Sequence, residues 1–354
     1  MEEQKDIVNL LNLITDPAFL VKDGRIFQLN PPAAQLMLEV GTPIAQLLPS
    51  PMDELDSFHE GCLYLTLFHA GQKLGTAAYP HADGLLFVIS SESDQAELRA
   101  LALTAAGMRQ LLSEMMQTAN GLQAIAQPDA TQHMAQLNKQ IYQLHRMVGN
   151  MTDAAQYAAA PQGNLACRDV VALTEEYFDH AQTLLAHSNL HLEYQLPNES
   201  ILCMVDAQLL ERAVYNMISN AAKFSHPGDT IRAGLRRKGQ RLQLWVEDTG
   251  DGIPKPILDT VYTRYQRTPG IEDGRFGLGL GMVMVRAAAC AHGGTVLITQ
   301  PSGGTRITLS FFVDQGRNTT LRSSALTIDY AGERDHALIE LADVLPASLY
   351  TNAF

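Results

Sequence analysis

The sequence has few cysteines and little positive charge. Its four cysteines are scattered over 354 residues without the spacing of a metal site, so we expect reduced structural thiols at Cys62, Cys167, Cys203 and Cys290. Lysine and arginine total 25 against 38 aspartate and glutamate residues, which gives a formal net charge of −13. Because nucleic-acid binding favours a basic surface, this balance argues against a nucleic-acid partner.

Long hydrophobic runs are also absent. No apolar stretch approaches the roughly 18 residues that a membrane span requires, and the polar residues 1–6 do not resemble a signal peptide. We therefore expect a cytoplasmic protein without a membrane span. With 46% apolar residues, a chain of this length can form two or three domains with buried cores.

Residues 206–225 read as a helix with two asparagines on one face. Asn216 and Asn220 lie one turn apart at helical spacing. An amide side chain offers an oxygen acceptor and two donors, and the oxygen suits Mg²⁺. One asparagine is predicted to bind Mg²⁺ and the other a phosphate or ribose. Lys223 can meet a phosphate as a point charge, and Phe224 can lie on a base.

Two glycine-rich segments follow. The alternating apolar run over residues 242–246 predicts a strand that ends at Asp248, and Gly250 and Gly252 then allow a tight turn against a ligand. Further on, glycines precede a predicted helix at residues 282–291. The N–H groups of a glycine-rich helix start form an anion site, so this second segment is also a candidate phosphate contact.

These motifs, in this order, resemble the ATP-binding domain of sensor histidine kinases, which shares its fold with gyrase, Hsp90 and MutL. The resemblance covers residues 169–314 and implies an α/β sandwich of the GHKL type that binds ATP. It also implies that Asn216 holds Mg²⁺ and that Asp248 accepts a hydrogen bond from the adenine amino group. The residues that it assigns to ATP are Asn216, Asn220, Lys223, Phe224, Asp248, Gly250, Gly252, Tyr262, Arg264, Tyr265, Arg267, Gly277, Leu278, Gly279, Leu280, Gly281 and Thr305.

The expected lid lies between Pro254 and Arg275. Within it, Tyr262 and Tyr265 match the aromatic box of the family, while Arg264 and Arg267 can reach the terminal phosphate when the lid closes. The family usually has a glycine where this chain has Arg275, a departure that bears on how the lid closes.

One position separates kinase-type use of ATP from rapid hydrolysis. Relatives such as gyrase carry a glutamate four residues before the Mg²⁺ asparagine, where it activates water. This chain has Arg212 there, and Glu211 is rotated by about 100° around the helix. The resemblance therefore favours kinase-type nucleotide binding.

Residues 1–92 are predicted to form a small α/β domain. A hairpin turning at Asp23-Gly24 is followed by a helix that Asn30 caps. Three apolar runs follow at residues 62–68, 74–79 and 84–90. This order resembles a PAS sensor domain. We interpret three histidines as surface or packed side chains rather than ligands: His59, His69 and His81.

Residues 93–160 carry two heptad-like stripes separated by a break near Pro128, which predicts a helical hairpin. The second stripe consists of Met134, Leu137, Ile141, Leu144, Val148 and Met151. Because one hairpin leaves apolar surface uncovered, we expect a homodimer with a four-helix bundle. In a histidine kinase the first helix of this hairpin carries the phosphoacceptor histidine.

That histidine is missing. No histidine occurs between Ala82 and Gln132, and alignment of the family pattern places Ala106 at the acceptor position. Alanine cannot be phosphorylated, so classical autophosphorylation at this position is excluded. On the second helix, His133 and His145 flank the apolar stripe and are interpreted as solvated. His145 is kept as an unorthodox acceptor.

Residues 161–168 are predicted to be a linker, and residues 315–354 a tail with a possible helix at 335–344 whose apolar side chains pack on the protein. The fold expected for the whole chain is thus multidomain α+β. Three functions stay open: a histidine kinase-like signalling protein that passes phosphate to a response regulator, a nucleotide-sensing pseudokinase scaffold, and a kinase acting on a residue of a partner protein.

Overall fold

The structure is a computed structural model. It describes residues 11, 13–48, 55, 58–89, 108, 115, 131–159, 164–253, 281–301, 304–313 and 335–351. The strands are β1 (Ala18–Lys22), β2 (Arg25–Leu29), β3 (Cys62–His69), β4 (Gln72–His81), β5 (Gly84–Ile89), β6 (Ala166–Asp169), β7 (His191–Gln195), β8 (Leu202–Val205), β9 (Thr230–Lys238), β10 (Arg241–Glu247), β11 (Thr295–Thr299) and β12 (Arg306–Phe312). The α-helices are α2 (Pro31–Gln35), α5 (Thr131–Ala159), α6 (Val170–Leu185), α7 (Ala207–Phe224), α9 (Gly281–Ala291) and α10 (His336–Glu340). The 3₁₀ turns are η1 (Ile44–Gln46), η3 (Ala186–Ser188) and η6 (Ala347–Tyr350).

The N-terminal part contains the predicted hairpin and capped helix. Asp23 and Gly24 both have positive φ, 50° and 72°, as a two-residue hairpin turn requires. The Asn30 side chain accepts hydrogen bonds from the backbone N–H groups of Ala18 and Ala33, and so caps α2. The three predicted apolar runs are β3, β4 and β5.

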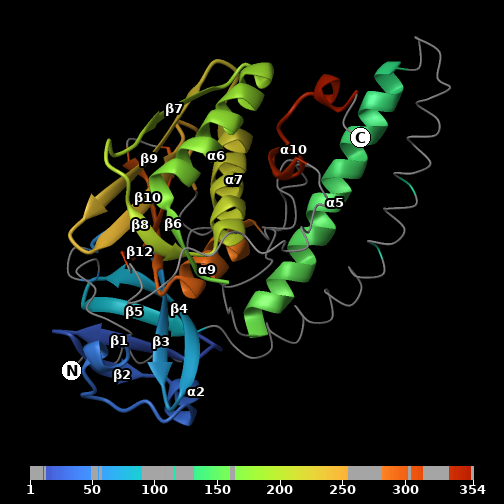
Figure 1. Cartoon of the computed structure of the whole chain (residues 1–354). Coiled ribbons are helices and arrows are strands. Elements are labelled where there is room, and N and C mark those ends of the chain that lie inside the picture. The colour runs from blue at the N-terminus through green and yellow to red at the C-terminus, as the bar shows by residue number, and fades with distance from the viewer. Residues whose placement is uncertain are drawn as a thin grey trace.

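The second half is an α/β sandwich, as predicted. Its strands lie in the order β11-β12-β10-β9-β7, with β7 and β9 parallel and the other neighbours antiparallel. Helices α6, α7 and α9 pack on one face of this sheet (Figure 1). The Asp206 side chain caps α7 by accepting from the N–H of Leu209 at 3.1 Å.

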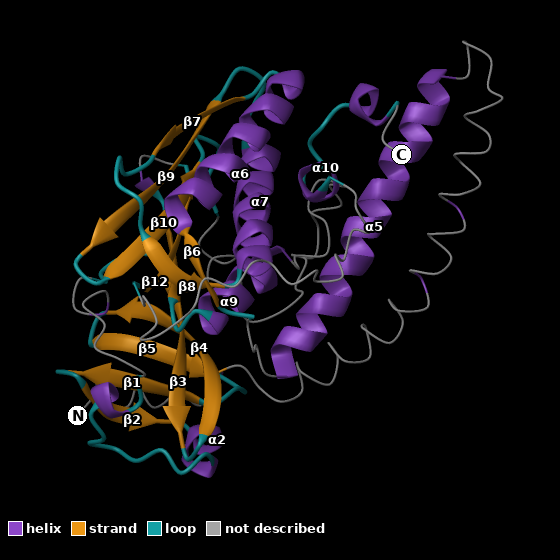
Figure 2. Ribbon diagram, in the orientation of Figure 1, coloured by secondary structure: helices purple, strands orange, loops and turns teal. Residues whose placement is uncertain are grey.

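The sheets of the two halves are continuous, which the sequence did not predict. β3 pairs with β11, so that Tyr64 lies opposite Val296 and the whole forms one ten-stranded sheet (Figure 2). The guanidinium of Arg286, on α9, lies 4.0 Å from the centre of the Tyr64 ring. Gly61 is needed at this joint, because a Cβ there would lie 1.9 Å from the carbonyl oxygen of Ile298.

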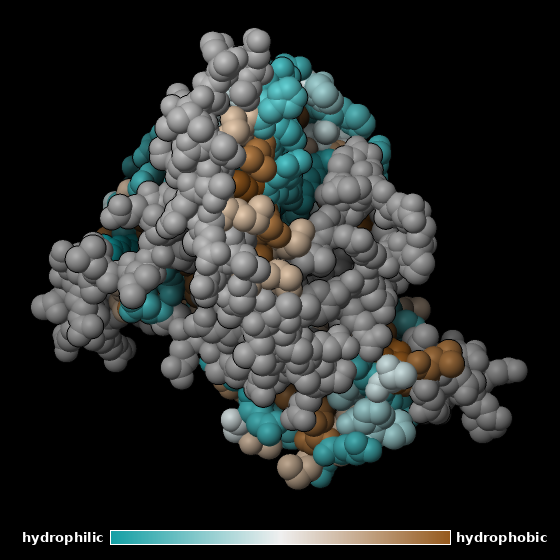
Figure 3. Space-filling model, turned by 90° about the vertical axis from the view of Figure 1, so that its right-hand side faces the viewer, coloured by the Kyte–Doolittle hydropathy of each residue, from teal (hydrophilic) through white to brown (hydrophobic). Residues whose placement is uncertain are grey.

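The long helix α5 covers the residues predicted for the second helix of the hairpin. Most of the first predicted helix, including Ala106, lies outside the described residues. Of the predicted stripe, Ile141, Val148 and Met151 are buried. A second buried face of α5 points toward α10, which lies between α5 and α7 in Figure 1. Seen from the side of α5, described polar and apolar residues both reach the surface (Figure 3).

Two boundaries differ from the prediction. Residues 166–168, which were predicted to lie in a linker, belong to β6. This strand pairs with β8, and the pairing provides hydrogen-bond partners for its backbone N–H and C=O groups. The tail helix ends at Glu340 rather than at residue 344, and its predicted apolar packing is present, since Ile339 and Leu341 are fully buried. In the described ranges no helix is both long and apolar enough to cross a bilayer.

Candidate functional site

The asparagine helix, α7, forms as predicted, but its two asparagines differ in environment. Apolar residues at every third or fourth position bury one side of the helix against the sheet. Asn220 is half-buried, whereas Asn216 is fully buried, with 0% exposure. A fully buried amide must satisfy its hydrogen bonds within the protein, so its partners decide what it can bind.

Each polar atom of Asn216 has a protein partner. Its Oδ1 accepts a hydrogen bond from Arg146 Nη2 at 3.1 Å. Its Nδ2 donates to the Arg212 carbonyl oxygen at 2.9 Å and to Glu340 Oε2 at 3.2 Å. The helix face that the sequence assigned to a metal ion is therefore covered by side chains from α5 and α10.

Glu340 is the centre of a buried ionic cluster. Its two carboxylate oxygens lie 3.2 Å from Arg146 Nε and 3.2 Å from Arg212 Nε. Arg212 also donates from Nη2 to Asn150 Oδ1, at 2.9 Å. Paired in this way, the three charged side chains are at most 6% exposed, and buried charges are stable only with such partners.

A second ion pair lies at the end of the same helix face. Lys223 Nζ is 2.6 Å from Asp343 Oδ2, which also lies 2.6 Å from Arg146 Nη1. Burial, and next the charge of Arg146, lower the pKa of Lys223. Burial opposes ionisation of Asp343, but the charges of Arg146 and Lys223 hold the pKa of that carboxyl below its ordinary value.

Sequence reasoning missed Arg146, Glu340 and Asp343. One signal was available on α5, where Asn138, Tyr142, Arg146 and Asn150 recur at every fourth position and all are buried. The other signal was a pair of acidic residues in an otherwise apolar stretch of the tail.

Asp248 lies at the end of β10, as predicted, and its carboxylate is 5% exposed. Oδ1 accepts from the backbone N–H of Gly250 at 3.0 Å and of Thr305 at 3.2 Å. Burial raises the pKa of Asp248, although these two N–H groups oppose the shift. Close packing requires glycine on both sides, since a Cβ at Gly250 or Gly304 would lie 2.2 Å or 2.0 Å from a backbone oxygen.

Comparison with known proteins matches the domain that contains α7 and Asp248 to a known family. Residues 205–315 match the family described as histidine kinase-, DNA gyrase B-, and HSP90-like ATPase. Sensor protein KdpD of Clostridium acetobutylicum is 28% identical over 165 residues, which cover 46% of this chain and 18% of KdpD. Adaptive-response sensory kinase SasA of Prochlorococcus marinus is 30% identical over 141 residues, covering 39% of this chain and 36% of SasA. The chain thus contains an ATPase domain of this family at residues 205–315 and is similar to sensor histidine kinases.

A solved structure of a histidine kinase agrees in fold. The crystal structure of full-length ShkA in complex with AMPPNP superposes with a TM-score of 0.51 at 20% identity, covering 61% of this chain and 46% of ShkA. This chain therefore spans less than half of KdpD, of SasA and of ShkA. The family match applies to residues 205–315.

The surroundings of Asp248 and those of Asn216 differ in how well they fit a nucleotide. At one end, the buried Asp248 carboxylate and the close-packed glycines fit an adenine base. At the other end, the oxygen of Asn216 that would hold Mg²⁺ accepts from the guanidinium of Arg146. The positive charge of this guanidinium would repel a divalent cation at the same oxygen, so the metal end does not fit Mg²⁺ as it is arranged here.

Several predicted site residues are not placed. The lid residues Tyr262, Arg264, Tyr265 and Arg267, and the glycine segment from Gly277 to Leu280, lie outside the described residues. Gly281 begins α9, and a Cβ there would lie 2.8 Å from Asn216 Oδ1. Phe224 is 41% exposed at the end of α7. On α5, His145 is half-buried rather than solvated, because that side of the helix faces the protein.

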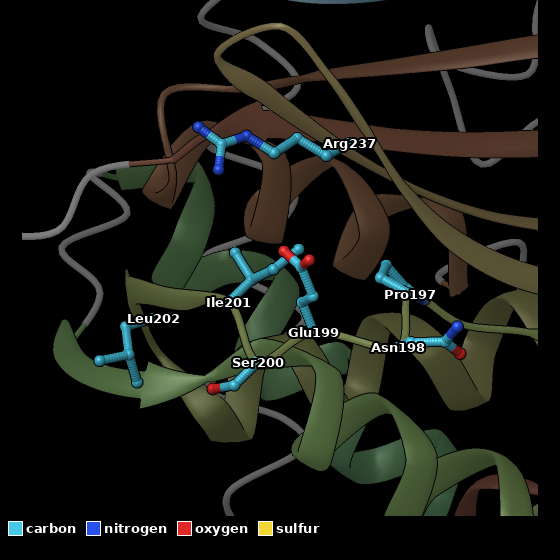
Figure 4. A pocket seen from close by; sticks show the side chains of 7 residues that line it. All are labelled: Pro197, Asn198, Glu199, Ser200, Ile201, Leu202 and Arg237. Carbon is cyan, nitrogen blue, oxygen red and sulfur yellow. The ribbon is translucent and has the colours of Figure 1, made fainter.

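A hollow elsewhere on the kinase domain does not coincide with this site. It is lined by the turn that joins β7 to β8, Pro197 to Leu202, and by Arg237 at the end of β9 (Figure 4). None of its lining residues belongs to α7 or to the Asp248 turn.

Proposed function

We propose that this chain is a signalling protein of the histidine kinase type that binds Mg²⁺-ATP through the domain at residues 169–314. The observation that carries the proposal is the geometry of Asp248. Its Oδ1 is held by two backbone N–H groups, and its Oδ2 accepts no hydrogen bond from the residues that the structure describes. That oxygen suits the exocyclic amino group of adenine, because an ionised acceptor strengthens the hydrogen bond.

The remaining contacts follow from positions along α7. Lys223 and Asn220 are proposed to bind phosphate or ribose, and Asn216 to hold Mg²⁺ once its present partners have moved. Gly250, Gly252 and Thr305 are proposed to frame the base. When bound, ATP supplies a phosphoryl group for transfer.

The signalling role is proposed from the similarity to sensor histidine kinases. One position departs from their pattern. Ala106 stands at the expected acceptor position, so we propose a degenerate phosphoacceptor in a homodimeric, cytoplasmic protein with a PAS-like input domain. A response regulator is the proposed partner. A pseudokinase scaffold is the second candidate, because Asn216 is engaged by protein side chains in this structure.

The test is calorimetric titration of the full chain with Mg²⁺-ATP. Asp248→Asn should weaken binding by at least about tenfold, since a hydrogen bond to a charged group is worth roughly 1.5–3 kcal/mol. Asp23→Asn is the matched control, because Asp23 is exposed in a turn with φ of 50°, which asparagine tolerates. Equal affinities for the two variants would contradict the assignment of Asp248.

A further inference from the structure

Residues 335–351, called here the C-terminal segment, fold against the asparagine helix. The segment starts at Asp335, which caps α10 through the N–H groups of Ala337 and Leu338. Its apolar side chains Ile339, Leu341, Ala342, Leu345 and Tyr350 are fully buried and belong to the same core as α7. The segment is therefore an integral element of this state and covers the site between α5 and α7 (Figure 2).

The charged side chains of the segment take the partners that a nucleotide needs. The Glu340 carboxylate lies 3.2 Å from the Nδ2 of Asn216 and bridges Arg146 and Arg212. The Asp343 carboxylate lies 2.6 Å from the Lys223 ammonium. Two carboxylates thus bind three cations that together form an anion site at the phosphate end of the proposed nucleotide site.

Phosphates carry the same charge as these carboxylates and use the same donors. A phosphate on Lys223 would lie beside the Asp343 carboxylate that now binds this ammonium, and like charges placed in one buried site repel strongly. A nucleotide and the C-terminal segment therefore cannot occupy this helix face together.

We propose that the C-terminal segment is a displaceable internal plug. It binds the anion site through Glu340 and Asp343, competes with the nucleotide phosphates for Lys223, and holds Arg146 against the Asn216 oxygen proposed for Mg²⁺. This inference rests on the proposed function. The plug keeps the nucleotide site closed until the segment leaves, so the apparent nucleotide affinity is the intrinsic affinity multiplied by the small fraction of molecules that are open. A partner that removes the segment would thereby switch on nucleotide binding.

The test compares the full chain with the double variant Glu340→Gln/Asp343→Asn. Mg²⁺-AMPPNP is titrated into each, and binding is measured by calorimetry. The variant should bind about tenfold more tightly or better, because neutral amides hold the three cations less firmly than carboxylates do. The control is Asp23→Asn/Glu193→Gln, which makes the same change of charge at two exposed positions and should bind like the unmodified chain.

A second variant leaves the anion site intact. Tyr350→Ala removes the ring that packs against Tyr142, 5.0 Å away, and loosens the segment without touching a charged group of the site. It should also bind nucleotide more tightly. Hydrogen exchange of the amides at residues 337–345 in the unmodified chain should rise when Mg²⁺-AMPPNP is added.

The outcomes separate the two proposals. Equal nucleotide affinity in the unmodified chain and in both segment variants, with unchanged exchange at residues 337–345, overturns the plug and leaves the proposed function standing. Weaker binding in both variants also overturns it, since the segment would then complete the site. No nucleotide binding by any form, the segment variants included, overturns the proposed function and the plug together.

Discussion

Arg146 Nη2 lies 3.1 Å from Asn216 Oδ1. The oxygen that the family would use for a metal ion thus accepts a hydrogen bond from a guanidinium that comes from a different part of the chain. Arg146 belongs to α5, for which the sequence predicts the second helix of a dimerisation hairpin. We therefore expect a movement of α5 to change the hydrogen bonds of Asn216.

Arg146→Ala tests the strength of this link. Glu340 would keep only one of its two guanidinium partners, and removal of one member of a buried ion pair costs about 3–5 kcal/mol. We expect the free energy of unfolding to fall by about 3 kcal/mol or more, measured by urea titration with the single tryptophan, Trp245, as the probe. The matched control, Arg237→Ala, changes an exposed arginine and should alter stability by under about 0.5 kcal/mol. Equal losses in the two variants would refute the role of the cluster.

The C-terminal segment should dock in a pH-dependent way. Asp335 lies 3.1 Å from His180 Nε2, and this hydrogen bond raises the pKa of His180, with Glu211 and Glu176 adding to the effect. A raised histidine pKa contributes stability that is complete below the ordinary value of 6.5 and is lost as pH rises through the folded value.

The same pair acts in the opposite sense at low pH. Burial opposes ionisation of Asp335, but the hydrogen bond from His180 holds its pKa below the ordinary value of 3.8. The Asp335 contribution is lost only as pH falls below that value. We expect the protection factors of the amides at residues 336–341, which compare their exchange with that of an unfolded chain at the same pH, to fall as pH rises through the raised pKa of His180. This fall in protection should vanish in His180→Gln, and an unchanged fall would assign the effect to another group.

The joint between β3 and β11 should be sensitive at Gly61. Gly61→Ala introduces a Cβ only 1.9 Å from the Ile298 carbonyl oxygen at a φ of +89°, so the strand pairing must shift. Gly71→Ala is the matched control, since Gly71 has a φ of +79° with nothing within 4 Å of the added atom. Both carry backbone strain of about 1–3 kcal/mol. We expect only Gly61→Ala to split thermal unfolding into two transitions, as seen by calorimetry.

Phosphate transfer gives the last prediction. The purified chain, incubated with Mg²⁺ and γ-labelled ATP, should acquire no stable label, because alanine at position 106 cannot carry phosphate. Acid-labile, base-stable label would contradict this expectation. His145→Gln and His133→Gln would then identify the acceptor. Parallel measurement of nucleotide binding distinguishes an absent acceptor from an absent nucleotide.

Local sequence patterns were sufficient to predict several helices and strands of the structure. Helical spacing predicted α7, alternation predicted β10 with Asp248 at its end, and the Asp23-Gly24 pair predicted the first hairpin. These features depend on residues a few positions apart, whose backbone preferences and side-chain directions are set locally. The dimer and the lid contacts stay predictions.

The sequence alone determined which residues could form an ATP site: Asn216, Lys223 and Asp248 stand in recognisable local motifs. Only the tertiary structure decided that Asn216 and Lys223 are closed off. Glu340 is 124 positions from Asn216 and 194 from Arg146, and no periodicity links such distant residues. In the sequence, Glu340 and Arg146 resemble ordinary solvated charges. In the structure they are buried against each other with water excluded, and this ion pair holds the site closed.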